Sequence, residues 1–110
     1  MKQGMDDKTK ARMEARTRIL KALAHPSRLF MVDQLAVEEK CVCVLAEMLA
    51  IDMSTASKHL TLLKHAGIVQ DEKRGSMVFY KLRVPKVMDC IDWVESIIKS
   101  TAQEQLNLMH

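Results

Sequence analysis

The sequence has few of the residues that define several large classes of protein. It contains three cysteines, three glycines and two prolines among 110 residues, and aromatic residues make up 4% of the chain. Three cysteines, two of them separated by a single residue, are too few for the disulfide framework of a small secreted protein, so we expect reduced thiols in a cytoplasmic protein. No apolar run approaches the ~18 to 20 residues of a membrane helix, and the first residues lack the apolar core of a secretory signal. We therefore expect no membrane partner.

Catalytic motifs are missing as well. The sequence has no glycine-rich loop that would cradle a phosphate, no paired carboxylates in a plausible pocket and no strained serine turn of the hydrolase type. A cysteine–histidine pair is conceivable from Cys41 or Cys43 with His25 or His65, but nothing in the spacing demands it. We expect a protein that is not an enzyme and that requires no cofactor.

Apolar residues make up 48% of the sequence and charged residues 28%, which is typical of a folded globular protein. The length fits one domain, and we predict a single domain over residues 1–110. The formal charge of +3 is unevenly distributed, because residues 54–86 carry seven basic and two acidic side chains whereas residues 21–53 and 87–110 are net acidic. The central basic segment predicts a face that binds nucleic acid.

Hydrophobic periodicity predicts five helices and one β-hairpin. The helices are expected over residues 8–24, from Pro26, over 42–49, from the N-cap Asp52 to Gly67, and from Pro85 onward. Between the last two helices the period changes to that of strands, over residues 68–70 and 77–82, with a polar turn at 71–76. The expected fold class is mainly α with a small β-hairpin, in the order of a winged helix-turn-helix.

The second helix of this helix-turn-helix begins with short hydroxyl and basic side chains. Such side chains belong on the exposed half of a recognition helix, where they reach base edges and phosphates in the major groove. The candidate DNA-facing residues are Ser54, Thr55, Ser57, Lys58 and His59. In the hairpin, Lys73 and Arg74 are placed to reach an adjacent minor groove or the DNA backbone. The alternative is an ordinary amphipathic helix with a solvated face, which the same residues would satisfy.

Four segments together resemble one family of regulators. The resemblance rests on HPSR (25–28), CVCVLAEML (41–49), STASKHLTLLKHAGIV (54–69) and DEKRGSMVFYKL (71–82), which are similar in order and spacing to the ArsR/SmtB winged-helix repressors. It implies a homodimer that binds an imperfect palindrome in double-stranded operator DNA and leaves it when an inducer occupies a sensor site. It also implies that the candidate residues above face the DNA. Met53 departs from the family pattern, in which a polar residue such as Gln is common.

A homodimer is also expected from the residues alone. The last helix carries a long apolar stripe, which a domain of this size cannot bury by itself. The stripe consists of Val87, Cys90, Ile91, Val94, Ile97 and Ile98. We predict that the first and last helices form the interface, with Trp93 as an anchor.

The segment Cys41-Val42-Cys43 resembles the arsenic-sensing segment of the family. Thiolates are soft ligands that suit As(III), Sb(III), Cd(II) or Cu(I) better than hard cations. Because residues two apart on an α-helix point about 200° away from each other, we expect one ion to join both sulfurs only if the start of the helix is frayed or unwinds. Such unwinding would disturb the support of the recognition helix and release DNA. As(III) prefers three sulfurs, and the remaining cysteine for that role is Cys90, unless it is a packing residue on the apolar stripe.

Two alternatives stay open. In the first, an oxidant or a persulfide modifies Cys41 or Cys43 together with Cys90, and the repressor responds to thiol redox state. In the second, the protein is a constitutive DNA-binding regulator without an inducer. Asp89 and Asp92 on the last helix are interpreted as a solvated face rather than a Zn(II) site, and the nine methionines as core filler rather than a copper site.

Overall fold

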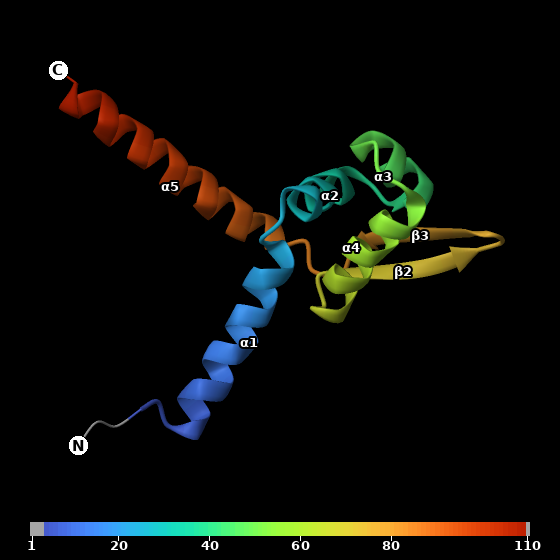
Figure 1. The fold of residues 1–110 in the computed structure, drawn as a ribbon, viewed down its shortest axis with the longest axis horizontal. Coiled ribbons are helices and arrows are strands. Elements are labelled where there is room, and N and C mark those ends of the chain that lie inside the picture. Colours follow the sequence, from blue (N-terminus) through green and yellow to red (C-terminus); the bar gives the residue numbers. More distant parts are fainter. Residues whose placement is uncertain (1–3, 110) are drawn as a thin grey trace.

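A computed structural model describes residues 4–109 as five helices and a three-stranded antiparallel sheet (Figure 1). In chain order the elements are α1 (Asp7–Leu23), α2 (Pro26–Val37), β1 (Lys40–Cys41), α3 (Val42–Leu49), α4 (Met53–His65), β2 (Val69–Arg74), β3 (Met77–Leu82) and α5 (Val87–Leu108). The helices, the hairpin and the winged helix-turn-helix order predicted from the periodicity are confirmed.

The prediction misses the short strand β1. Lys40 and Cys41 pair antiparallel with Tyr80 and Phe79 of β3, which places β3 between β1 and β2. A strand of two residues is too short to show an alternating pattern, and its partner lies far along the chain. The polar break predicted between α2 and α3 is therefore anchored to the sheet.

Strand β2 also extends further than predicted. The predicted strand ends at Gln70, whereas pairing with β3 continues to Arg74, opposite Met77. Every residue of β2 after Val69 is exposed, so hydrophobic alternation does not reveal this part of the strand. The connecting loop is short, and Gly75 within it has φ +62°, a conformation that glycine accepts without strain.

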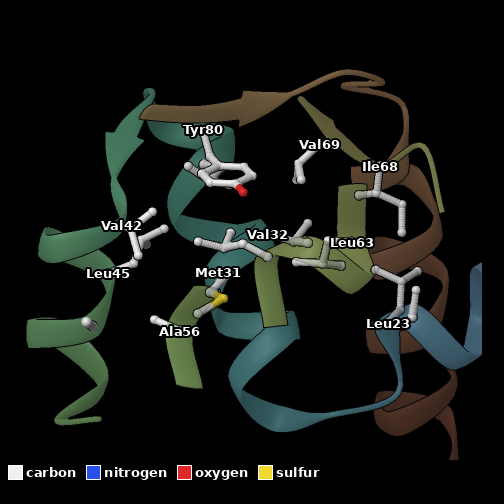
Figure 2. Close-up of a cluster of buried hydrophobic side chains, with 14 residues drawn as sticks. Leu23, Met31, Val32, Val42, Leu45, Ala56, Leu63, Ile68, Val69 and Tyr80 are labelled. Atoms are coloured by element: carbon white, nitrogen blue, oxygen red, sulfur yellow. The ribbon is translucent and has the colours of Figure 1, made fainter. Parts of the chain in front are cut away.

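The hydrophobic core lies between the sheet and helices α2, α3 and α4 (Figure 2). Its largest fully buried side chains are Met31, Val32, Leu45, Leu60, Leu63 and Val69. Tyr80 of β3 closes the core from the sheet side. Within the described residues no polar or charged residue is buried, so apolar packing dominates this core.

Helices α1 and α5 project away from the core in different directions (Figure 1). The radius of gyration is 17.6 Å, whereas a compact domain of this length has about 13 Å. Helix α5 contains no buried residue, and Trp93 and Ile97 are 73% and 64% exposed. The single chain therefore leaves a large apolar surface uncovered. No helix in the described part of the chain is long and apolar enough to cross a membrane.

The turn between α3 and α4 contains a residue in an unfavourable backbone conformation. Ala50 ends α3 with φ +54° and ψ +44°, in the left-handed region that residues with a Cβ atom avoid. Hydrogen bonds from Ala50 N–H to Glu47 O (3.1 Å) and from Ile51 N–H to Ala46 O (3.0 Å) hold this conformation. The geometry is that of a helix C-terminus at which glycine is favoured.

We predict that Ala50→Gly raises the free energy of unfolding by about 0.5 to 1 kcal/mol, because glycine removes the left-handed penalty. The control is Ala66→Gly, since Ala66 ends α4 with φ −79° and ψ −5°, where alanine is unstrained. The control should lower the free energy of unfolding by about 0.5 to 1 kcal/mol. Urea unfolding at equal protein concentrations measures both values, and a destabilised Ala50→Gly variant would contradict the prediction.

Candidate nucleic-acid interface and thiol site

The start of α4 is held by its own cap. The carboxylate of Asp52 accepts hydrogen bonds from the N–H of Thr55 (2.7 Å) and from the hydroxyl of Ser54 (2.9 Å). These bonds, the one from the Thr55 backbone first, hold the pKa of Asp52 below its ordinary value. Asp52 thereby occupies one of the backbone donors at the start of α4 that could otherwise bind an anion.

The outer face of α4 presents most of the predicted DNA-facing side chains. Ser54 and Lys58 are exposed, and Thr55 and Ser57 are half-buried. The sequence reasoning missed three residues that share this face. Ser57 and Lys58 line a shallow hollow of about 480 Å³ together with Thr61, Leu62 and His65. Continuing the spacing of three and four residues from Ser54 along the helix would have found Thr61 and His65.

His59 does not share this outward orientation. Its ring lies against that of His25 at a tilt of 45°, with the centroids 4.5 Å apart, and its Nδ1 accepts a hydrogen bond from Arg28 Nη1 at 3.1 Å. Arg28 also donates to Ala22 O (2.6 Å) at the end of α1, and His25 caps α2 by accepting from Ser27 N–H (3.0 Å). The histidine predicted to face DNA is half-buried and links α4 to the junction between α1 and α2, and its contact with DNA stays a prediction.

The two basic residues at the tip of the hairpin lie on opposite faces of the sheet. Asp71 of β2 forms an ion pair with Lys64 of α4, with the nitrogen and oxygen 3.0 Å apart, so this side of β2 faces α4. Side chains alternate along a strand, which places exposed Lys73 on the same side as Asp71. Lys73 is therefore on the side of the hairpin that continues the outer surface of α4.

Arg74 points to the other face and is engaged within the protein. Its guanidinium forms a bidentate ion pair with Glu39, at 2.6 and 3.0 Å, and contacts Glu72 at 2.7 Å. It also lies over the ring of Phe79, 4.6 Å from the centroid. The hydrogen bonds to Glu39 and then Glu72 raise the pKa of Arg74, as expected for a cation held by two anions. Arg74 thus fastens the hairpin to the segment before β1, and its contact with DNA stays a prediction.

The thiols of Cys41 and Cys43 meet because Cys41 lies outside the helix, so the opposed directions of two residues within one helix do not apply to this pair. Cys41 belongs to β1 and is the N-cap of α3, with φ −78° and ψ 158°, and only Cys43 lies within the helix. The extended backbone at Cys41 turns its sulfur toward that of Cys43, and the two form a disulfide with the Cα atoms 5.4 Å apart. This bond closes a very small ring and does not join distant parts of the chain.

The thiol pair lines a hollow between three functional elements. The hollow has a volume of about 150 Å³, and its lining residues come from the start of α3, the start of α4 and the tip of the hairpin. These are Cys41, Val42, Cys43, Met53, Ser57, Ser76, Met77 and Val78. Cys41 is buried and Cys43 is exposed, so the pair is reached from one side.

Cys90 is not brought to this hollow. It is a free, half-buried cysteine of α5 that packs against the core, and it lines a different hollow with Leu23 and Gly67 among others. Within residues 4–109 no three side chains of His, Cys, Asp or Glu come together as a metal-binding group. The oxidised pair is Cys41 with Cys43, rather than either of them with Cys90.

Comparisons with known proteins point to one family. Residues 25–71 match the family model described as bacterial regulatory protein, arsR family. The chain is 37% identical to the arsenic resistance transcriptional regulator ArsR1 of Pseudomonas putida, over 74% of this chain and 61% of the relative. It is 35% identical to an HTH-type transcriptional regulator of Methanocaldococcus jannaschii, over 76% of this chain and 96% of the relative.

A solved structure agrees with the fold along nearly the whole chain. It is the homodimeric winged helix-turn-helix DNA-binding domain of a possible ArsR-family regulator from Mycobacterium bovis. The TM-score is 0.77 at 27% identity, and the match covers 94% of this chain and 95% of that one. The chain spans only about half to three fifths of the first curated relatives, at 52% and 61% of their lengths.

The contacts of His59 predict a loss of stability in acid. Burial lowers the pKa of His59 first, and His25 and Arg28 lower it further. The unfolded chain therefore binds this proton more readily, so the free energy of unfolding should fall as the pH drops below about 6.5 and should not depend on His59 above about pH 7. We expect His59→Gln, which keeps an acceptor without titrating, to lose less stability than the wild type between about pH 7.5 and about pH 5.5.

Urea unfolding at the two pH values measures this difference. The control is His65→Gln, which removes an exposed histidine from the same helix. Between the two pH values its free energy of unfolding should fall by as much as that of the wild type. Equal losses in the wild type and in His59→Gln would show that the prediction is wrong.

Proposed function

The chain belongs to the arsR family of bacterial regulatory proteins, and from this premise we propose that it is a transcriptional repressor released from operator DNA by a thiophilic inducer at Cys41 and Cys43. One observation carries the proposal. The two cysteines share a hollow with Met53 and Ser57 of α4 and with Met77 of β3, so the site that takes the inducer adjoins both elements that would contact DNA. Chemistry at the thiols therefore acts directly on helix and hairpin.

The DNA-binding surface consists of the outer face of α4 and the face of the hairpin that continues it. Ser54, Thr55, Ser57 and Lys58 supply polar contacts in the major groove, and Lys73 reaches a flanking phosphate or minor groove. Arg74 and His59 position these groups, because one holds the hairpin to Glu39 and the other holds α4 to Arg28. Direct contact of Arg74 and His59 with DNA stays a prediction.

The DNA-binding unit is a homodimer formed through α1 and α5. Support comes from the exposed apolar side chains on these two helices, which one chain leaves uncovered. They include Leu20 on α1, and Trp93, Val94, Ile97 and Ile98 on α5, with exposures from 49% to 73%. A twofold axis between two such chains would set the recognition helices about one DNA turn apart (~34 Å), which suits an imperfect palindrome.

The inducer acts on the thiol form of the pair. As(III), Sb(III), Cd(II) or Cu(I) would bind the two sulfurs, of which the exposed Cys43 offers the first contact. Because Cys41 is both the cap of α3 and a partner of Phe79 in the sheet, a ligand drawn to its sulfur shifts the start of α3 relative to the hairpin. The arsenic resistance regulator of Pseudomonas putida supports a metalloid as one inducer.

A second candidate function is a repressor that responds to thiol oxidation. The disulfide between Cys41 and Cys43 favours this reading, because an oxidant would need no further residue to lock the pair. Oxidation of the two thiols removes two electrons and two protons, which the oxidant accepts. The same pair of cysteines would then sense the redox state of the cell rather than the presence of an ion.

For DNA binding, we predict that Lys58→Ala and Lys73→Ala each weaken operator binding and flatten its dependence on salt. Each lost phosphate contact lowers the slope of log K against log salt by about one, and therefore by about two per dimer. The matched control is Lys81→Ala. Lys81 is an exposed lysine of the same hairpin, and it lies with its partner in the register, Gln70, on the sheet face away from α4. Fluorescence anisotropy with an operator fragment selected from a random DNA pool measures the slopes. An unchanged slope in Lys58→Ala and Lys73→Ala would refute the assigned face.

For induction, we predict that the double variant Cys41→Ser with Cys43→Ser keeps its operator affinity within about twofold but no longer leaves DNA when arsenite or a thiol oxidant is added. The fold should tolerate the change, because serine is a favoured N-cap at the Cys41 position. The control Cys90→Ser should be released like the wild type. Release of the double variant would refute the thiol-sensor proposal, and a wild type that no thiophilic ion or oxidant releases would be a constitutive regulator.

A further inference from the structure

Another hollow adjoins the outer face of α4, on the side of α1. It has a volume of about 240 Å³, and its lining residues come from α1 and from the end of α4. These are Arg18, Lys21, Ala22, Leu62, His65 and Ala66. Leu62 and His65 also line the hollow that contains Ser57 and Lys58, so the two hollows are neighbours. The proposed DNA-binding surface therefore continues from α4 onto α1.

Arg18 and Lys21 are the two cations that α1 contributes to this surface. They lie three residues apart, which places them on one face of the helix about one turn from each other. Both side chains are exposed. The ion pairs among residues 4–109 involve Lys40, Lys64 and Arg74, so no carboxylate holds Arg18 or Lys21. The two cations are available to an anion from outside the chain.

The charge of this surface has one sign. The two neighbouring hollows are lined by nine residues in all, and none of the nine is acidic. Three of them, Arg18, Lys21 and Lys58, carry a positive charge. Glu14 precedes Arg18 by four residues on α1 but does not line the hollow. A continuous basic surface of this kind attracts the phosphate backbone of a nucleic acid.

We propose that Arg18 and Lys21 bind phosphates of the operator, as a third contact in addition to those of α4 and the hairpin. The inference rests on the proposed DNA-binding function and deepens it. A guanidinium or an ammonium group binds phosphate whatever the base sequence, so this contact contributes affinity and register rather than base recognition. Both residues lie before the segment 25–71 that matches the family model, so that match does not include them.

The arrangement of the elements indicates where on the operator this contact lies. Helix α1 and the hairpin are on opposite sides of α4 (Figure 1). In the proposed homodimer the twofold axis runs beside α1 and α5, so α1 is nearer to the axis than α4 is, and the hairpin is farther away. The axis passes through the centre of a palindromic operator. Arg18 and Lys21 therefore bind phosphates between the two half-sites, whereas Lys73 binds phosphates toward the outer ends.

The first test measures how operator binding depends on salt, with the operator fragment selected from a random DNA pool. Arg18→Gln and Lys21→Gln each remove one positive charge, and the fold should persist because glutamine is a good helix former. We expect each variant to lower the slope of log K against log salt by about one per protomer, and therefore by about two per dimer. Urea unfolding and sedimentation check that the variants remain folded and dimeric. Wild-type slopes in both variants would overturn the inference.

Two controls separate a phosphate contact from other effects of substitution. Arg18→Lys keeps the charge at the same position and should keep the wild-type slope. Lys99→Gln removes an exposed lysine of α5, which projects in a different direction from α1, and should also keep the wild-type slope. If Arg18→Lys or Lys99→Gln lowered the slope as much as Arg18→Gln, the effect would not come from a charge placed on α1, and the inference would be wrong.

The second test locates the contact by ethylating single phosphates of the operator. In the wild type, ethylation between the two half-sites should interfere with binding. This interference should disappear in Arg18→Gln with Lys21→Gln, whereas Lys73→Ala should lose interference toward the outer ends instead. Interference between the half-sites that persists in the double variant would contradict the proposed contact.

The outcome is distinguishable from that of the proposed function. If no DNA from the pool binds the wild type, or if Lys58→Ala and Lys73→Ala leave the slope unchanged, the assigned face of α4 and the hairpin fails. If these two lysine variants lower the slope but Arg18→Gln and Lys21→Gln do not, the proposed function stands and the contact from α1 is wrong.

Discussion

The pairing of two residues, Lys40 and Cys41, with the centre of β3 is the constraint on which most of this structure depends. Because of this pairing, the segment between α2 and α3 forms the edge strand β1 of the sheet, and this strand ends where α3 begins. Cys41 is consequently in extended backbone rather than in the helix, and its sulfur meets that of Cys43. The same pairing brings Glu39 within reach of Arg74, so the hairpin is attached both by backbone and by a bidentate ion pair.

Several charged and polar residues near α4 hold the helix in place through contacts within the protein. Asp52 closes its N-terminus, Arg28 contacts His59 in its middle, and Lys64 pairs with Asp71 near its end. An exposed ion pair such as Lys64–Asp71 adds little to global stability, but together with the hydrogen bond from Arg28 to His59 it joins α4 to the hairpin and to α2. The side chains left free on the outer surface, such as Lys58 and Lys73, then keep a defined spacing, which a proposed contact to regularly spaced phosphates requires.

The hollow at the thiols is the place where these elements converge. Residues from α3, α4 and β3 border a space of about 150 Å³. A proposed ligand in that space therefore has a direct physical route to the DNA-binding surface and needs no long path through the core. The apolar faces of α1 and α5 lie outside this arrangement and remain available for a second chain.

The sequence by itself determined the helices, their order and the winged helix-turn-helix class, because these depend on local periodicity, on caps such as Asp52 and on turn residues such as Gly75. It also indicated the thiol pair and the polar face of α4. Only the tertiary structure decided β1, the true length of β2, the contact of His59 with Arg28 and the engagement of Arg74. Each of these depends on a partner distant in sequence, as in the pairs of His59 with Arg28 and Arg74 with Glu39, and no local pattern of residues records such a contact.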